Sequence, residues 1–321
     1  MILSVIIPIY GVEPFIANCT RKLLSQYTDG VEYIFVDDAS PDSSVDILKQ
    51  IANEEFPQLK PHITIIRKTC NEGLPQARKT GIEAAQGDYI MHCDSDDWIH
   101  NGAIEIIMNK IKTTKSDVLY YNYFISSADN NIPSNETLFT TPRDYMEAIM
   151  SFMPNSGAYC WNKVARRSLY KHVEEWPIQN MHEDIALMPQ ILQHAQSLEF
   201  IETPLYHYRS NSSTSMSQDF SKNKKKKCES KNNQLILLHF LQRHHLTTIF
   251  SKPYHQMVVR CAYIAAFFDR SSILTDLDYH KELLHCPLYK HFDVSLRRQI
   301  QSRLIIYAYS LLKKVRISQR S

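Results

Sequence analysis

Short apolar runs alternate with amphipathic segments along the first 93 residues of the chain. The apolar runs are rich in β-branched residues and predict buried strands at 2–9, 31–36, 62–67 and 88–93. The amphipathic segments have apolar positions at helical spacing and predict helices at 12–26, 43–52 and 76–86. Pro75 suits the first turn of the third helix and Gly87 suits its C′ position. This alternation predicts an α/β fold with a mostly parallel central sheet flanked by helices.

The alternation is less regular in the rest of the chain. Strands are predicted at 118–124 and 198–209, a strand or turn at 157–164, and helices at 143–153 and 182–195. Residues 221–233 are basic and low in complexity, which predicts a mobile connector. From Gln234 onwards the pattern is helical to the end.

Polar side chains follow three of the first four predicted strands. Tyr10 follows the first, Asp37 and Asp38 the second, and the cluster Asp94–Asp97 the fourth. Ligands of parallel sheets bind beyond the carboxyl ends of the strands. The coincidence of these residues at one edge therefore predicts the binding site there.

Composition narrows the functional class. With 321 residues, 44% hydrophobic and 22% charged, the chain suits one large soluble domain or a domain with an appendage. A net charge of +2 gives no indication of nucleic-acid binding. The 7 cysteines include no C-x-x-C pair, which argues against a zinc knuckle and fits a reducing compartment. The N-terminus lacks the features of a signal peptide, and we expect a cytoplasmic protein.

The acidic stretch IMHCDSDDWI, residues 90–99, has three interpretations. A turn can solvate the carboxylates, one of them (Asp96 or Asp97) can cap a helix near 101–112, or a cation can bind between them. Capping accounts for one aspartate and leaves the others to repel each other. A D-x-D arrangement on a tight turn places two carboxylates around a hard divalent cation, which in turn bridges a diphosphate. The residues favour this last interpretation.

Several motifs, taken in order, resemble family 2 glycosyltransferases, which have the nucleotide-diphospho-sugar transferase (GT-A) fold. They are SVIIPIYGVEPFI, VDDASPDSS, NEGLPQARKTG, GDYIMHCDSDD and HED. The resemblance is continuous over residues 1–125 and then consists of isolated points to about residue 215. It implies an inverting, metal-dependent transfer of a hexosyl or N-acetylhexosaminyl group from a UDP-sugar. The implied acceptor is a hydroxyl of a saccharide or lipid-linked glycan, in bacterial surface-polysaccharide biosynthesis.

Two other functions fit the sequence less well. A non-catalytic nucleotide-sugar-binding or scaffolding module would not need the full set of acidic positions that the chain carries. A sugar-nucleotide pyrophosphorylase needs a glycine- and arginine-rich loop after the first strand, and YGVEPFI at residues 10–16 is rich in neither.

The resemblance implies a nucleotide site and a cation site. Asp94 would approach the ribose or a metal-bound water, and Asp96 would coordinate Mn²⁺ or Mg²⁺ directly. Asp97 is assigned to the turn and the next helix, and Asp37 either to the turn or to a ribose or base contact. In this site Tyr10 stacks on or edges the base, and Asp38 recognises uracil. The residues assigned to nucleotide binding are Pro8, Tyr10, Asp38, Arg78, Asp94 and Ser95.

The later motifs imply the catalytic base and several further contacts. Asp184 of the Glu183–Asp184 pair corresponds to the general base, although acidic residues in a first helical turn are also favoured by the helix dipole. For each of four more residues the resemblance implies a binding role, and an ordinary structural role is the alternative interpretation. Trp161 and Lys163 are assigned near the acceptor or diphosphate, His207 near the metal and Arg209 on the diphosphate, followed by Asn211–Ser213.

The predicted domains follow from these assignments. Residues 1–215 form the GT-A domain, with a nucleotide-binding half at 1–115 and an acceptor and catalytic half at 116–215. A basic connector at 216–233 leads to a helical region at 234–321. The lysine run 224–227 is either a solvated loop or a contact with anionic lipid. The basic amphipathic segment 294–320 favours peripheral contact with the cytoplasmic face of the inner membrane.

Overall fold

The structure is a computed structural model that describes residues 1–127, 130–210, 223–273, 282–289 and 293–318, with side chains up to residue 311. The chain divides into two compact units, which are described separately. The first comprises Met1–Ile178 and Leu187–Ser215, and the second comprises Gln179–Ala186 and Met216–Ser321.

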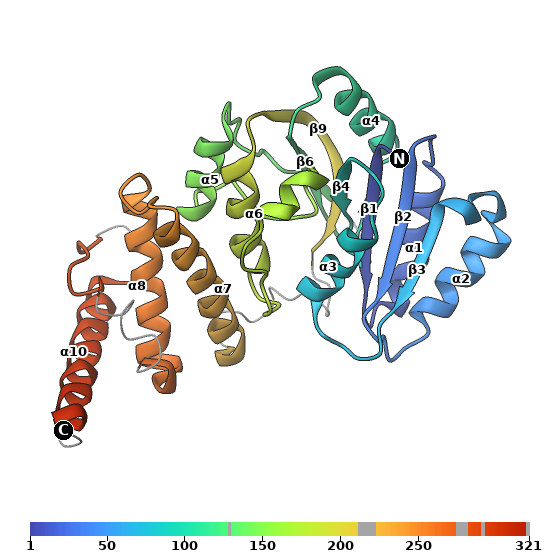
Figure 1. The fold of residues 1–321 in the computed structure, drawn as a ribbon. Helices are drawn as coiled ribbons and strands as arrows, with labels where there is room; N and C mark the ends of the chain where they lie inside the picture. Colours follow the sequence, from blue (N-terminus) through green and yellow to red (C-terminus); the bar gives the residue numbers. More distant parts are fainter. Residues whose placement is uncertain (128–129, 211–222, 274–281, 290–292, 319–321) are drawn as a thin grey trace. The chain divides into compact units, whose positions relative to one another are not determined.

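The first unit is built on one mixed sheet (Figure 1). Its parallel half consists, in spatial order, of β3 (Ile63–Arg67), β2 (Val31–Asp37), β1 (Leu3–Ile9) and β4 (Tyr89–His92). The sheet continues through β8 (Lys163–Arg166), β6 (Val118–Ser126), β9 (Leu198–Arg209) and β5 (Trp98–Ile99), while β7 (Asn131–Pro133) pairs with β6. The β4–β8 and β8–β6 pairs are antiparallel and the β6–β9 pair is parallel. The predicted mostly parallel sheet is confirmed.

Helices cover both faces of the parallel half. The helices α1 (Glu13–Leu24), α2 (Ser44–Glu54) and α4 (Ala103–Thr114) share one hydrophobic core with the face of β1 that carries Val5 and Ile7. On the opposite face α3 (Leu74–Ala84) packs against β1 and β2. The remaining short elements are η1 (Pro57–His62), α5 (Pro142–Met150) and η2 (Arg167–His172).

The register aligns the carboxyl ends of the central strands. Ile9 at the end of β1 is paired with Asp37 of β2, and Ile6 is paired with His92 of β4. The backbone N–H groups of Asp38 and Cys93 then donate to the carbonyls of Ile9 and Ile6. This alignment brings the polar residues that follow the strands to one edge of the sheet, as predicted.

Gly87 has a different role from the predicted one. The helix α3 ends at Ala84, so Gly87 is not its C′ residue. A Cβ atom at Gly87 would lie 2.7 Å from the backbone nitrogen of Ser4 and 2.9 Å from the carbonyl carbon of Leu3. The glycine therefore permits close approach of the chain to β1.

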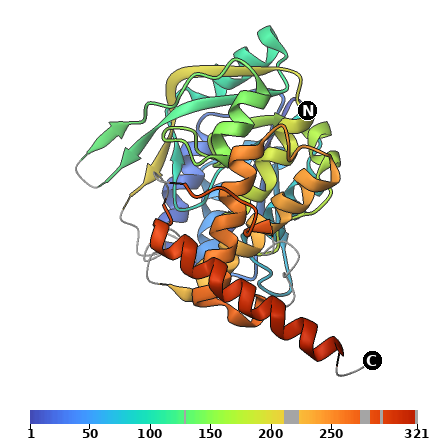
Figure 2. The same cartoon turned by 90° about the vertical axis from the view of Figure 1, so that its left-hand side faces the viewer.

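The second unit is helical. Its segment Gln179–Ala186 contains the start of α6 (Glu183–His194), and the other elements are α7 (Lys224–Arg243), α8 (Ser251–Phe268), η3 (Arg270–Ile273) and α10 (Leu296–Ser318). Within this unit α8 packs against both α7 and α10 (Figure 2). No helix in the described part of the chain is both long enough and apolar enough to cross a membrane.

The predicted connector is wrong from residue 224 onwards, where α7 begins; residues 216–222 lie outside the described part. The Asn223 side chain caps this helix by accepting from the N–H of Lys226. Lys231 is buried and its Nζ lies 3.0 Å from Asp269 Oδ2 and 2.7 Å from Ser272 Oγ. Lysine is a good helix former, which favours a helix over a connector here. The two partners of Lys231 compensate the cost of burying its ammonium group, and the polar sequence by itself does not indicate such a buried position.

We expect the substitution Gly87→Ala to destabilise the protein by about 1–3 kcal/mol, the usual effect of overpacking. The reason is the clash of the new methyl group with the β1 backbone, which cannot swing aside as a side chain can. Urea unfolding measures the change, with Gln86→Ala at the neighbouring exposed position as the control. A Gly87→Ala protein within about 0.5 kcal/mol of wild type would contradict this account of the packing.

Candidate active site

The D-x-D motif forms a tight turn after β4 and is fastened to the end of β1. The N–H of Asp97 donates to the carbonyl of Asp94 at 3.1 Å, which closes the turn. The hydroxyl of Ser95 donates to the carbonyl of Pro8 at 2.7 Å. These bonds place the D-x-D turn beside Pro8 at the end of β1, and the binding roles of Pro8, Ser95 and the two carboxylates stay predictions. Tyr10, two residues after Pro8, is 50% exposed and can reach a ligand.

Arg78 holds the first D-x-D carboxylate. Its Nη2 lies 2.7 Å from Asp94 Oδ1, and its side chain is only 2% exposed. The Asp94 carboxylate is less deeply buried, and its backbone N–H donates to the hydroxyl of Tyr206 at 3.0 Å. Arg78 thus orients Asp94, and its assignment to nucleotide binding stays a prediction.

Asp97 connects the turn to β9. The Tyr206 hydroxyl donates to its Oδ2 at 3.0 Å, and the N–H of Arg209 donates to its Oδ1 at 2.7 Å. Burial raises the pKa of Asp97 well above its usual value, and the negative charges of Asp96 and Asp94 add to the effect. The prediction that Asp97 serves the turn agrees with this geometry, but α4 is preceded by Gly102, so Asp97 does not cap the next helix.

Arg209 places a positive charge beside the turn. Its Nε donates to the carbonyl of Asp96 at 2.9 Å. Its guanidinium lies 4.8 Å from the ring centroids of both Phe15 and Trp98, and contact with the two rings holds it in place. This position suits the predicted contact with a diphosphate. The following residues Asn211–Ser213 lie outside the described part of the chain.

The D-x-D carboxylates fit a divalent cation of the Mg²⁺ or Mn²⁺ type. No group of three or more His, Cys, Asp or Glu side chains with metal-binding geometry occurs among the described residues. Mg²⁺ is usually bound by one or two carboxylates together with substrate phosphates, and not by a full protein cage. Asp94 and Asp96, which are both partly accessible, provide such a pair.

The two aspartates after β2 are engaged inside the protein. Asp38 is 2% exposed; its oxygens accept from the N–H groups of Glu72 and Gly73, and Lys68 Nζ lies 2.9 Å from its Oδ1. Asp37 accepts from the N–H of Ser40 at 2.7 Å, which matches the turn alternative. Recognition of uracil by Asp38 stays a prediction, and it requires the carboxylate to become exposed.

A loop of small polar residues, part of the motif VDDASPDSS, supports the Tyr10 segment. The Ser40 hydroxyl accepts from the N–H of Gly11 at 2.9 Å, and Asp42 Oδ2 accepts from the N–H of Glu13 at 2.9 Å. Burial acts to raise the pKa of Asp42, but hydrogen bonds from Ser44, Ser40 and the backbone lower it to about 2. The sequence signal for this loop is the composition of SPDSS, because Asp and Ser side chains often form hydrogen bonds with nearby backbone groups.

The structure corrects the assignments of Trp161 and Lys163. Trp161 is 5% exposed and stacks against Tyr159, Tyr206 and Tyr208, so it is a core residue and not an exposed platform for a sugar ring. Lys163 is also buried, and its Nζ donates to the carbonyls of Gly157 and Tyr159 and to Oδ1 of Asn162. A lysine satisfied in this way shapes the loop before β8 and does not face an acceptor or diphosphate.

His207 is a satisfied histidine of the sheet, which was the structural alternative. Its Nε2 lies 3.0 Å from His100 Nδ1, and its Nδ1 lies 2.9 Å from the Ser126 hydroxyl. The ring stacks between those of Trp98 and Phe124. Both nitrogens are therefore engaged within the protein, which corrects the predicted approach to a metal.

Asp184 lies in the first turn of α6, in the second unit. Its Oδ1 accepts from the N–H of Ile185 at 2.8 Å, and the side chain is partly accessible, whereas Glu183 is buried. His182, directly before the helix, has a positive φ of 61° and its Nδ1 lies 2.7 Å from the Ser230 hydroxyl. The role of Asp184 as a base stays a prediction.

Comparison with known proteins identifies the class. The family model described as "Glycosyl transferase family 2" matches residues 4–174, and the chain belongs to this family. Along the sequence it is 31% identical to EpsH of Bacillus subtilis over 215 residues, which cover 64% of this chain and 60% of EpsH. The chain thus spans less than two thirds of that relative's length.

Two solved structures share the fold. One is Staphylococcus aureus TarS 1–349 in complex with UDP-GlcNAc, with a TM-score of 0.59, 17% identity, and 97% of this chain and 92% of that one covered. The other is the mannosyltransferase PcManGT of Pyrobaculum calidifontis in complex with GDP-Man and Mn²⁺, with a TM-score of 0.53, 14% identity, and 97% and 87% covered. The predicted family and GT-A fold are confirmed.

We expect His207 to make stability depend on pH. Burial, followed by the positive charges of His100 and Lys22, lowers the pKa of His207 to about 4. An unfolded histidine titrates near ~6.5, so between these values the unfolded chain binds a proton that the folded protein does not. Stability should therefore fall as the pH drops from about 6.5 to about 4.

The comparison of wild type with His207→Phe isolates this effect, because phenylalanine keeps the stacking and cannot titrate. The stability advantage of wild type, measured by urea unfolding, should be largest near neutral pH and shrink as the pH falls. His285→Phe, at an exposed position, is the control. A wild-type advantage that does not change with pH would refute the assignment.

Proposed function

We propose that the chain transfers a sugar from a UDP-sugar to a hydroxyl group of a saccharide or lipid-linked glycan, with inversion at the anomeric carbon. The observation that carries the proposal is the D-x-D turn fastened to the end of β1, with Arg78 beneath it and Arg209 beside it. A solved neighbour bound to UDP-GlcNAc supports the choice of nucleotide. The resemblance to surface-glycan enzymes supports bacterial surface-polysaccharide biosynthesis as the setting.

The residues at the carboxyl ends of the strands then have different roles in donor binding. Tyr10 is exposed beside the end of β1 and contacts the base, while Asp94 and Asp96 hold Mn²⁺ or Mg²⁺ together with the diphosphate. When bound, the cation offsets the negative charge that builds up on the leaving diphosphate. Arg209 adds a fixed positive charge near the same group, held by the Asp96 carbonyl and two aromatic rings.

Asp184 is the proposed general base. Its carboxylate is partly accessible and lies in the first turn of α6, where the helix dipole favours a negative charge. It would take the proton of the acceptor hydroxyl as that oxygen attacks the anomeric carbon. A single displacement of this kind inverts the anomeric configuration. The donor half is assigned to residues 1–115 and the acceptor and catalytic half to 116–215.

Two substitutions should distinguish a loss of sugar transfer from a loss of donor binding. Asp184→Asn should retain UDP binding and lower the rate of transfer by about 10²–10⁴-fold, the usual contribution of a general base. Asp96→Asn should instead lose the Mn²⁺-dependent part of UDP binding. UDP release in the presence of simple acceptors measures transfer, and the thermal shift with UDP, with and without Mn²⁺, measures binding.

Asp46→Asn, at an exposed position on α2, is the matched control and should change neither quantity. If Asp184→Asn turns over normally, the assignment of the base is wrong. If wild type binds UDP and releases none from any UDP-sugar and acceptor, the chain is the non-catalytic binding module that was the alternative.

We also propose that α10 contacts the cytoplasmic surface of the membrane. One face of α10 packs in the second unit through Gln299, Ser302 and Ile306. On the rest of its surface, exposed apolar side chains recur every three or four residues: Leu296, Ile300, Leu304, Tyr307 and Leu311. The segment 294–321 contains no acidic residue. Exposed apolar side chains in a basic segment suit a surface of anionic lipid.

Leu304→Ser should weaken binding to phosphatidylglycerol vesicles about tenfold, because a leucine side chain contributes ~1.5–3 kcal/mol when buried. Vesicle co-sedimentation measures the change. Leu138→Ser is the matched control, since Leu138 in the first unit is 66% exposed and Leu304 is 65% exposed. Equal vesicle binding by wild type and both variants would show that α10 does not contact the lipid.

A further inference from the structure

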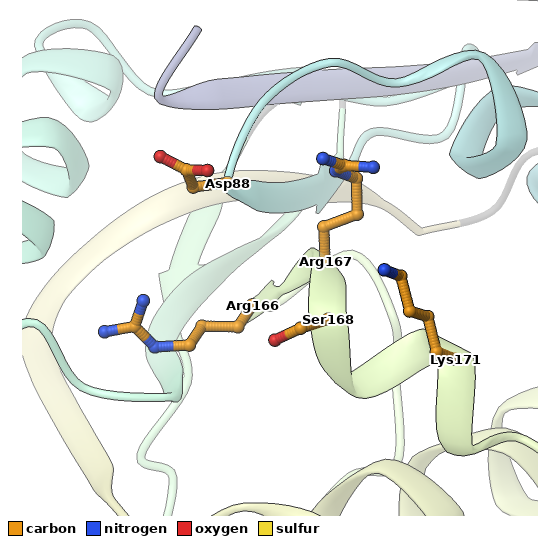
Figure 3. Close-up of a pocket in the computed structure, with 5 residues that line it drawn as sticks. All are labelled: Asp88, Arg166, Arg167, Ser168 and Lys171. Carbon is orange, nitrogen blue, oxygen red and sulfur yellow. The ribbon is translucent and has the colours of Figure 1, made fainter.

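A basic pocket lies in the first unit, at the end of β4 opposite to the D-x-D turn. It is open to solvent, has a volume of about 140 Å³ and is lined by Asp88, Arg166, Arg167, Ser168 and Lys171 (Figure 3). Asp88 directly precedes β4 and Asp94 follows it, and extended chain rises ~3.3 Å per residue, which separates the two by roughly 20 Å. The pocket is therefore distinct from the candidate active site.

The arginines of the pocket are held in place by contacts with neighbouring side chains and backbone. Arg166 pairs with Asp117, with Nε 2.8 Å from Oδ1, and its guanidinium lies over the Tyr89 ring. Arg167 donates from Nε to the carbonyl of Gly87 at 2.7 Å. This bond fixes the Arg167 guanidinium and does not involve its two terminal nitrogens. The terminal nitrogens of Arg167 are thus hydrogen-bond donors in a fixed position. Binding to them does not incur the loss of conformational entropy that the ordering of a mobile side chain would.

Two further donors border the cavity. Among the residues that the structure describes, neither the Ser168 hydroxyl nor the Lys171 amine has a hydrogen-bond or ion-pair partner. In Figure 3 the side chains of Arg167 and Lys171 extend toward the same side from η2. With Arg166 neutralised by Asp117, the charges of Arg167 and Lys171 exceed that of Asp88. The pocket therefore attracts anions.

A guanidinium fork, an ammonium group and a hydroxyl are together the usual donors to a phosphate. The cavity is far larger than the ~10–15 Å³ that one water molecule needs, so a group with several oxygens can enter. We propose that this pocket binds the phosphoryl group of a phosphorylated molecule, through Arg167, Ser168 and Lys171. Asp88 opposes the anion and lowers the affinity. This site does not rest on the proposed transferase function.

Binding of inorganic phosphate and of glycerol 3-phosphate tests the proposal, measured by titration calorimetry at constant ionic strength. Wild type should bind with saturation. Lys171→Gln should weaken binding about three- to tenfold, since hydrogen bonds to charged groups contribute more than neutral ones. Asp88→Asn should strengthen binding by a similar factor, because it removes the opposing charge. Lys49→Gln, an exposed lysine on α2, is the matched control and should have no effect.

Phosphatidylglycerol vesicles identify the source of the phosphoryl group. Weaker flotation of Lys171→Gln, together with unchanged flotation of Lys49→Gln, would assign the pocket to a lipid headgroup. Saturable glycerol 3-phosphate binding without an effect on flotation would assign it to a soluble phosphate ester. The proposal is overturned if neither ligand binds with saturation, if Lys171→Gln and Lys49→Gln behave alike, or if Asp88→Asn fails to strengthen binding.

Discussion

The ion pair between the buried Arg78 and the partly accessible Asp94 is the constraint on which the geometry of the site depends. A guanidinium that is 2% exposed has lost most of its hydration, and a close carboxylate is what compensates that loss. Asp94 therefore has a structural task as well as its proposed one in the donor site. Loss of activity after substitution of Asp94 would report on the fold as much as on the cation.

Neighbouring residues of the D-x-D turn are held by different elements. Asp94 is held by Arg78 of α3, Ser95 by the end of β1, and Asp97 by Tyr206 and Arg209 of β9. Each contact fixes one residue, and together they leave the turn little freedom to rearrange. A preorganised turn of this kind lowers the cost of ordering a cation and a diphosphate on binding.

The parallel half of the sheet and the D-x-D edge were predictable from the sequence, because short apolar runs bounded by polar residues specify buried strands and their ends. The burial and the hydrogen-bond partners of individual polar side chains were not predictable in this way. Asp38, Lys163 and His207 are all buried, and each is satisfied by groups that come close only in the folded chain. The part of the helix Lys224–Arg243 that precedes Gln234 was missed for the same reason, since the partners of Lys231 lie 38 and 41 residues further along.

The bond between Tyr206 and Asp97 has a consequence for the order of folding. The four residues of the turn are adjacent in sequence, yet the bond that joins Asp97 to β9 connects positions 109 residues apart. Contacts of such large sequence separation form late, because the intervening chain must first be ordered. During synthesis, the first half of the chain would build its parallel strands while the turn still lacked its contacts with β9. The donor site would mature only after β9 had left the ribosome.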